Sequence, residues 1–225
     1  MLGDIVERCR ERNVLKIFNT AGSFEENFKV LKTASAFNGI VYPVLGLSPH
    51  SVDLADLDLK LEEVLKLIDK ERPAAIGEIG LDFHFDYDKE AQLKVFESQL
   101  QLAQTLDIPV VVHSRDAERE CLQKMVDFKV RGVFHFFLVP DLVDEVKGKF
   151  LISLPTIKSK RREKIIKKMG LEGVVCETDS PFAWSGVNEP CNVVEVYDKL
   201  ASTLHLSSEV VQEKVMANVK SFFRV

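Results

Sequence analysis

The sequence predicts an α/β fold, a TIM-type (β/α) barrel of residues 1–225 as a single domain, with the first strand missing. Short, nearly unbroken apolar segments alternate strictly with longer amphipathic segments, as in a parallel sheet covered by helices. No Gly-x-Gly-x-x-Gly loop occurs, which disfavours a doubly wound dinucleotide-binding sheet. Polar residues follow several of the apolar segments, and in a barrel the carboxyl ends of the strands meet on one face.

The apolar segments give the expected strands. They number seven, at residues 14–20, 40–47, 74–81, 108–113, 132–137, 150–154 and 173–178. A complete barrel has eight strands and about 250 residues, whereas this chain has 225 and opens on a helix. We therefore expect one leading strand to be absent. The open edges, around 14–20 and 173–178, would then invite a covering segment or a homo-oligomer.

The amphipathic segments give the expected helices, and apolar residues recur in them at helical spacing. Ser23 is the expected N-cap of the second helix, and Gly170 is expected to end the seventh. The expected ranges are 4–12, 23–37, 56–71, 89–107, 117–128, 142–149, 161–170, and roughly 191–204 and 207–223.

Composition and charge exclude several classes of protein. No apolar run is long enough to cross a bilayer, and the N-terminus is charged by residue 4, unlike a secretory signal. Four scattered cysteines without a Cys-x-x-Cys pair indicate a reducing, cytoplasmic location. The net charge of −5 argues against broad electrostatic capture of nucleic acid. The basic run 158–168 is the local exception, and most of it is expected to face solvent.

Carboxylates and histidines stand where the expected strands end. Glu78, His113, His135 and Asp179 each close a different strand, so a barrel would bring them together. Taken singly, Glu78 fits a helix cap and Asp179 an Asx turn. Four such coincidences favour a metal site instead, and these ligands suit several divalent ions. A bound metal would lower the pKa of its water and polarise a phosphoryl or carbonyl oxygen.

The motifs "GEIGLDFHFD", "HSRDA", "FHFF", "ETDSPF" and "NEP" resemble those of the TatD-type metal-dependent hydrolases. The resemblance covers nearly the whole chain. It implies an amidohydrolase-superfamily barrel that hydrolyses phosphodiester bonds, as a deoxyribonuclease or exonuclease, with a divalent metal such as Mg²⁺, Mn²⁺ or Zn²⁺. It also implies that Glu78 is shared between two metals, that His113 and His135 complete one shell, and that Asp179 ligates the other and handles the proton of the water.

The chain departs from the family pattern at the first strand. The family's Asp-x-His-x-His motif is absent, and Ser48 replaces the first histidine of its His-Pro-His turn. Three interpretations stay open. The chain is a one-metal hydrolase, its native start lies upstream of Met1, or it is a catalytically impaired barrel that acts as a binding or interaction protein.

Three residues are candidates for substrate binding. Lys158 follows the strand whose loop often holds phosphate in barrels. Arg115 lies two residues after His113 and suits a phosphate, although a helix-capping salt bridge explains it equally well. His50 ends the segment "PVLGLSPH". The expected substrate is a nucleic acid or a small phosphodiester.

Overall fold

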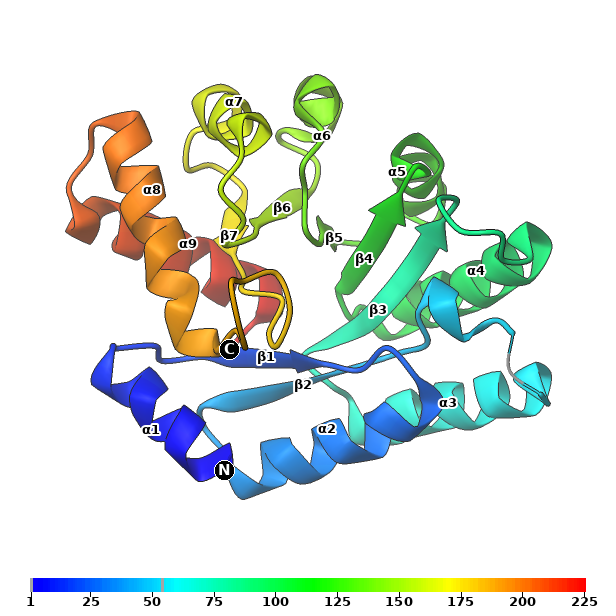
Figure 1. Ribbon diagram of the computed structural model, residues 1–225. Helices are drawn as coiled ribbons and strands as arrows, with labels where there is room; N and C mark the ends of the chain where they lie inside the picture. Colours follow the sequence, from blue (N-terminus) through cyan, green and yellow to red (C-terminus); the bar gives the residue numbers. More distant parts are fainter. Residues whose placement is uncertain (1, 54) are drawn as a thin grey trace. The chain divides into compact units, whose positions relative to one another are not determined.

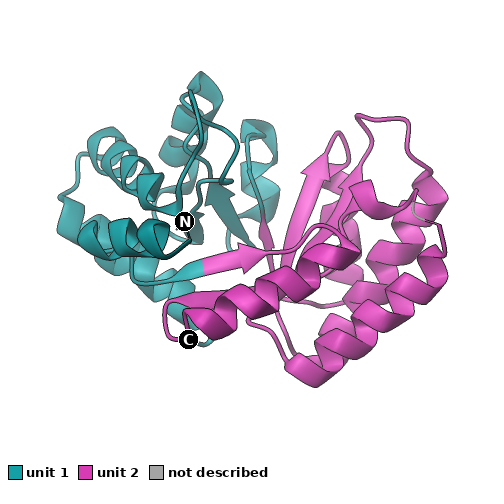
Figure 2. Ribbon diagram, turned by 60° about the horizontal axis from the view of Figure 1, so that its bottom comes forward, with its two compact units in different colours: residues 1–17, 135–225 teal, residues 18–134 magenta. Residues whose placement is uncertain are grey.

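The computed structural model describes residues 2–53 and 55–225, and its contacts divide the chain into two compact units. Unit 1 consists of residues 1–17 and 135–225, and unit 2 of residues 18–134 (Figure 2). Each unit contains parallel strands covered by helices, which confirms the α/β class. The prediction of a single domain stays a prediction.

Unit 2 holds the strands from β1 to β5, and these follow one another in chain order within the sheet. The strands are β1 (Ile17–Thr20, whose first residue belongs to unit 1), β2 (Val41–Leu45), β3 (Ala75–Asp82), β4 (Val110–Arg115) and β5 (Gly132–Phe134). The helices between them are α2 (Phe24–Ala36), η1 (Pro49–Ser51), α3 (Leu57–Glu71), α4 (Lys89–Leu106) and α5 (Glu118–Asp127). Helix α2 packs on β2, α4 on β3 and α5 on β4 (Figure 1).

Unit 1 holds two paired strands, β6 (Leu151–Leu154) and β7 (Val174–Cys176). Its helices are α1 (Leu2–Glu11), η2 (Pro140–Leu142), α6 (Val143–Val146), α7 (Lys160–Met169), η3 (Pro190–Val193), α8 (Val194–Leu204) and α9 (Ser208–Phe223). Helix α9 packs on β7, and α8 lies against both α7 and α9. None of the helices in the described part of the chain is long and apolar enough to span a membrane.

The predicted helix ends are confirmed where cap chemistry was visible in the sequence. Ser23 and Glu26 form a complete capping box at the start of α2, in which each side chain accepts a hydrogen bond from the backbone N–H of the other residue. Gly170, with a φ of +68°, ends α7. These local signals act over three or four residues and need no tertiary contact.

All seven strands are present, but three of them are shorter than predicted at their carboxyl ends. The second strand ends at Leu45 rather than 47. The fifth strand ends at Phe134 rather than 137, because Phe136 adopts a left-handed φ of +51° that breaks the extended backbone. The last strand ends at Cys176 rather than 178, and Asp179 has a φ of +58°. The breaks in the fifth and last strands fall beside residues predicted to bind metal, where the chain turns out of the sheet.

Buried side-chain amides join helices to the carboxyl ends of strands in unit 2. The Asn27 amide on α2 donates to the Gly46 carbonyl and accepts from its N–H, at 2.9 Å each. Gln99 on α4 bonds Leu47 in the same two-way manner, and Gln92 bonds Asp82. Each amide bonds both the backbone N–H and the carbonyl of one residue at the end of a strand. Buried polar groups of the backbone require such partners. They hold the strand ends in place beneath the site.

Candidate metal centre

The register of β3 and β4 sets the geometry of the site in unit 2. Strand β3 has an irregular register between Ile76 and Ile79, and the carboxylates of Glu78 and Asp82 both face the His113 ring. His113 on β4 pairs opposite Gly80. A Cβ on Gly80 would lie 2.0 Å from the His113 carbonyl oxygen, so only glycine permits this close approach. The His113 ring therefore lies between the two carboxylates.

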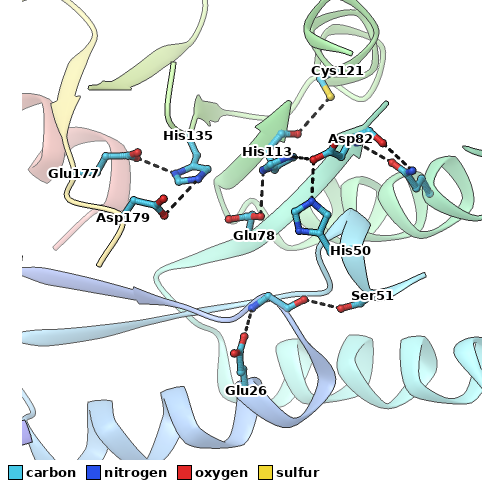
Figure 3. Close-up of polar contacts among 12 residues, drawn as sticks. Glu26, His50, Ser51, Glu78, Asp82, His113, Cys121, His135, Glu177 and Asp179 are labelled. Atoms are coloured by element: carbon cyan, nitrogen blue, oxygen red, sulfur yellow. Dashed lines mark hydrogen bonds and ion pairs between the residues drawn. The ribbon is translucent and has the colours of Figure 1, made fainter. Parts of the chain in front are cut away.

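The Asp82 carboxylate forms a hydrogen bond with one nitrogen of the His113 ring. Its Nε2 lies 2.9 Å from Asp82 Oδ2, and the Nε2 of His50 lies 2.8 Å from the same oxygen (Figure 3). Burial opposes ionisation of Asp82, but hydrogen bonds from His50, His113 and the His84 backbone N–H outweigh it and lower its pKa. An ionised carboxylate only accepts, so both imidazoles carry their proton on Nε2.

A neutral His113 ring with its proton on Nε2 presents the lone pair of Nδ1 on the other side. That atom lies 3.4 Å from Glu78 Oε1, longer than an ordinary hydrogen bond. Two donors bound to one ion at about 2.1 Å lie roughly 3.0–3.4 Å apart. The nitrogen and oxygen donors thus fit a divalent metal, and Asp82 fixes the tautomer as carboxylates behind metal-binding histidines do.

Unit 1 repeats this arrangement around His135. Glu177 Oε2 lies 3.0 Å from His135 Nδ1, and Asp179 Oδ1 lies 3.9 Å from His135 Nε2 (Figure 3). Burial disfavours the Glu177 carboxylate, but the His135 ring and neighbouring donors outweigh it and hold the pKa of Glu177 below its ordinary value. Glu177 therefore keeps the ring proton on Nδ1 and turns the Nε2 lone pair toward Asp179.

The loop that carries Asp179 is organised by Asn188, the first residue of the "NEP" motif. Its buried amide donates to the Thr178 carbonyl at 2.7 Å and the Phe182 carbonyl at 2.9 Å. Glu189, the next residue, forms a two-pronged ion pair with Arg8 on α1, both distances 2.7 Å. The motif thus supports the residues on either side of Asp179.

The structure places the four predicted ligands as two pairs, Glu78 with His113 in unit 2 and His135 with Asp179 in unit 1. Their assignment as metal ligands stays a prediction. The helix-cap reading of Glu78 does not describe the contacts found, because α2 and α4 are capped by Ser23 and Asp88 and the Glu78 carboxylate faces His113. The Asx turn at Asp179 stays a prediction.

The three substrate-binding candidates have different surroundings. His50 joins the cluster in unit 2 through Asp82, at η1. The exposed Arg115 pairs with no carboxylate among the described residues, so the helix-capping salt bridge is not found, and its guanidinium lies over the Phe85 ring. Lys158 is exposed just before α7. The basic run faces solvent as predicted except at Arg162, which is buried and donates to the Pro155 carbonyl at 2.7 Å.

Sequence reasoning did not assign roles to Asp82, Glu177 and Asn188. Asp82 and Glu177 each stand at a strand end that already carries a predicted ligand, Glu78 and Asp179 respectively. Pairs of carboxylates spaced by four or two residues are the signal that could have found them, because a ligating histidine needs an acceptor for its other nitrogen. Asn188 lies in a loop and leaves no comparable periodic signal.

The fold and these carboxylate–histidine sites define a TIM-type α/β hydrolase that depends on a divalent metal. Residues 2–224 match the family model "TatD related DNase", and the chain belongs to that family. It is 32% identical to the human deoxyribonuclease TATDN3 over 244 residues, covering 99% of this chain and 88% of that one.

A further relative is named a metal-dependent hydrolase, and a solved structure matches in fold. The chain is 32% identical to the metal-dependent hydrolase MJ1582 of Methanocaldococcus jannaschii, covering 98% of this chain and 90% of that one. The crystal structure of YjjV, a TatD homologue from Escherichia coli K12, matches with a TM-score of 0.91 at 24% identity, covering 100% of this chain and 92% of that one. This likeness confirms the TIM-type fold.

Proposed function

We propose that this chain hydrolyses phosphodiester bonds of nucleic acid, as a metal-dependent nuclease of the deoxyribonuclease or exonuclease type. The observation that carries the proposal is the paired carboxylate–histidine geometry, in which each histidine has one nitrogen held by one carboxylate and the other nitrogen facing a second carboxylate. Human TATDN3, a relative of similar length, is named a deoxyribonuclease.

Glu78, His113, His135 and Asp179 are the residues proposed to hold divalent metal. When bound, the metal lowers the pKa of a water and stabilises the charge that develops on phosphoryl oxygens. Asp82 and Glu177 orient the two imidazoles from behind. Asp179 is partly exposed and is the proposed acceptor of the water's proton. Glu78 is the proposed ligand on the Nδ1 side of the neutral His113 ring.

Arg115 and Lys158 are proposed to contact phosphate. Both side chains are exposed, and Arg115 has a planar fork suited to phosphate oxygens. His50 is proposed to face substrate with the part of its ring that Asp82 leaves open, since its side chain is 40% exposed. We also propose a cytoplasmic location, which the four free cysteines support, and a homo-oligomer as a candidate assembly.

The experiment is hydrolysis of labelled single-stranded DNA with Mg²⁺, Mn²⁺ or Zn²⁺ added to chelator-treated protein. Glu78→Gln and Asp179→Asn should each lower the rate by about 100-fold or more, because they remove a ligand and a proton acceptor. Glu90→Gln, an exposed glutamate at the start of α4, is the matched control and should keep the parent rate.

The alternative is a catalytically impaired barrel that acts as a binding or interaction protein, and it rests on the missing His-x-His ligands. It predicts no metal-dependent product with any of the three ions. A rate unaffected by Glu78→Gln would equally overturn the proposed assignment.

A further inference from the structure

An exposed aromatic side chain stands beside the site in unit 2. Phe85 lies in the loop between β3 and α4, and 46% of it is exposed. Several large apolar side chains of this chain are exposed to a similar degree, so exposure alone carries no conclusion. What distinguishes Phe85 is the set of groups that surround its ring.

The Phe85 ring is held in place by its neighbours. The Arg115 guanidinium carbon lies 5.1 Å from the ring centroid, within the range of a cation–π contact. The rings of His84, Tyr87 and His50 meet it at centroid distances of 5.1, 5.8 and 6.1 Å, the two histidines edge to face. A ring fixed on several sides with nearly half its surface open is preorganised to accept another flat group.

The aromatic contacts continue from Phe85 toward the proposed metal ligand. The His50 ring lies 6.1 Å from Phe85 and 5.0 Å from His113, centroid to centroid. A nucleotide is larger than one such step, so a base at Phe85 and a phosphate near His113 are within the reach of one short strand. Arg115 lies over the Phe85 ring, two residues after His113 on β4, and no described carboxylate pairs with it.

We propose that Phe85, supported by Arg115, is a stacking platform for an unpaired base of the single-stranded DNA substrate. Stacking on an aromatic ring beside a cation is how proteins bind single strands without reading sequence. The platform gives a chain of net charge −5 a local way to hold nucleic acid without a broad basic face. The proposal rests on the proposed nuclease function and adds the residue that holds the base.

The test is fluorescence anisotropy with a short labelled oligothymidylate and an abasic strand of equal length, both in chelator so that no strand is cut. Phe85→Ala should weaken oligothymidylate binding by about tenfold and leave abasic binding unchanged. Phe85→Trp should retain binding. In a Trp184→Phe background its indole becomes the only one, and stacking should quench its fluorescence.

Phe28→Ala is the matched control, because Phe28 on α2 is 49% exposed and also contacts another ring edge to face, that of Phe24. It should bind both strands like the parent. Equal affinity of the parent for the two strands, or equal loss of both on Phe85→Ala, would overturn the platform. Base-dependent binding through Phe85 without any hydrolysis would support the platform and refute the proposed function. Hydrolysis by the parent, together with base-dependent binding that Phe85→Ala leaves unchanged, would support the proposed function and refute the platform.

Discussion

In each histidine pair, one carboxylate fixes which ring nitrogen carries the proton and which faces the proposed metal position. Asp82 is fully buried and accepts hydrogen bonds from two imidazoles and one backbone N–H. Its anion is tolerated in the interior only because these donors surround it. The sequence predicted His113 and Glu78 as ligands from their strand-end positions. It could not show which nitrogen of His113 would face Glu78, because that depends on the register of two strands.

Replacing Asp82 by Ala should lower the free energy of unfolding by about 3 kcal/mol, because two histidines lose their acceptor and a buried space opens. Urea denaturation measures this loss in the free energy of unfolding. The matched control is Asp86→Ala, an exposed carboxylate four residues further along, which should change stability by less than about 0.5 kcal/mol. Equal midpoints for the two variants would show that Asp82 has no such structural role.

At the level of elements, strands and helices could be predicted because their signals are local. Apolar runs marked all seven strands, and Ser23 and Gly170 marked helix ends. The errors in the strand bounds occur at both ends: the first strand begins at Ile17 rather than 14, and the fifth ends at Phe134 rather than 137. Phe136 belongs to an apolar run that reads as strand, yet its backbone is left-handed. That turn depends on tertiary contacts, including the Phe137 N–H that bonds the Ser153 carbonyl at 3.0 Å.

The pairing of β3 with β4 depends on Gly80. Gly80→Ala should destabilise the protein by more than about 3 kcal/mol or prevent folding, because its Cβ would overlap the His113 carbonyl. Gly148→Ala is the control, since Gly148 also has a positive φ, +79°, but nothing lies within 4 Å of the added Cβ. It should lose only about 1 kcal/mol, measured by the same denaturation. Gly80→Ala no less stable than Gly148→Ala would disprove the close-approach argument.

At the scale of the whole molecule, the family pattern is kept over residues 2–224 while the His-x-His motif is absent from this sequence. The sequence could predict the class of fold, since alternation along the whole chain is visible without coordinates. It could not predict whether the remaining ligands suffice, because affinity depends on how well each donor is preoriented. The buried Asp82 and the half-buried Glu177, hydrogen-bonded to His113 and His135, supply that preorientation.

Metal binding by the isolated chain is therefore the measurement to make first, by calorimetric titration of Mn²⁺ or Zn²⁺ into metal-free protein. We expect stoichiometric binding by the parent chain and its loss in Glu78→Ala and His113→Ala, because each removes a proposed donor. His205→Asn, a histidine at the exposed end of α8, should bind like the parent. No binding by the parent at millimolar excess of either ion, or full binding by both ligand variants, would mean that these residues do not form the metal site.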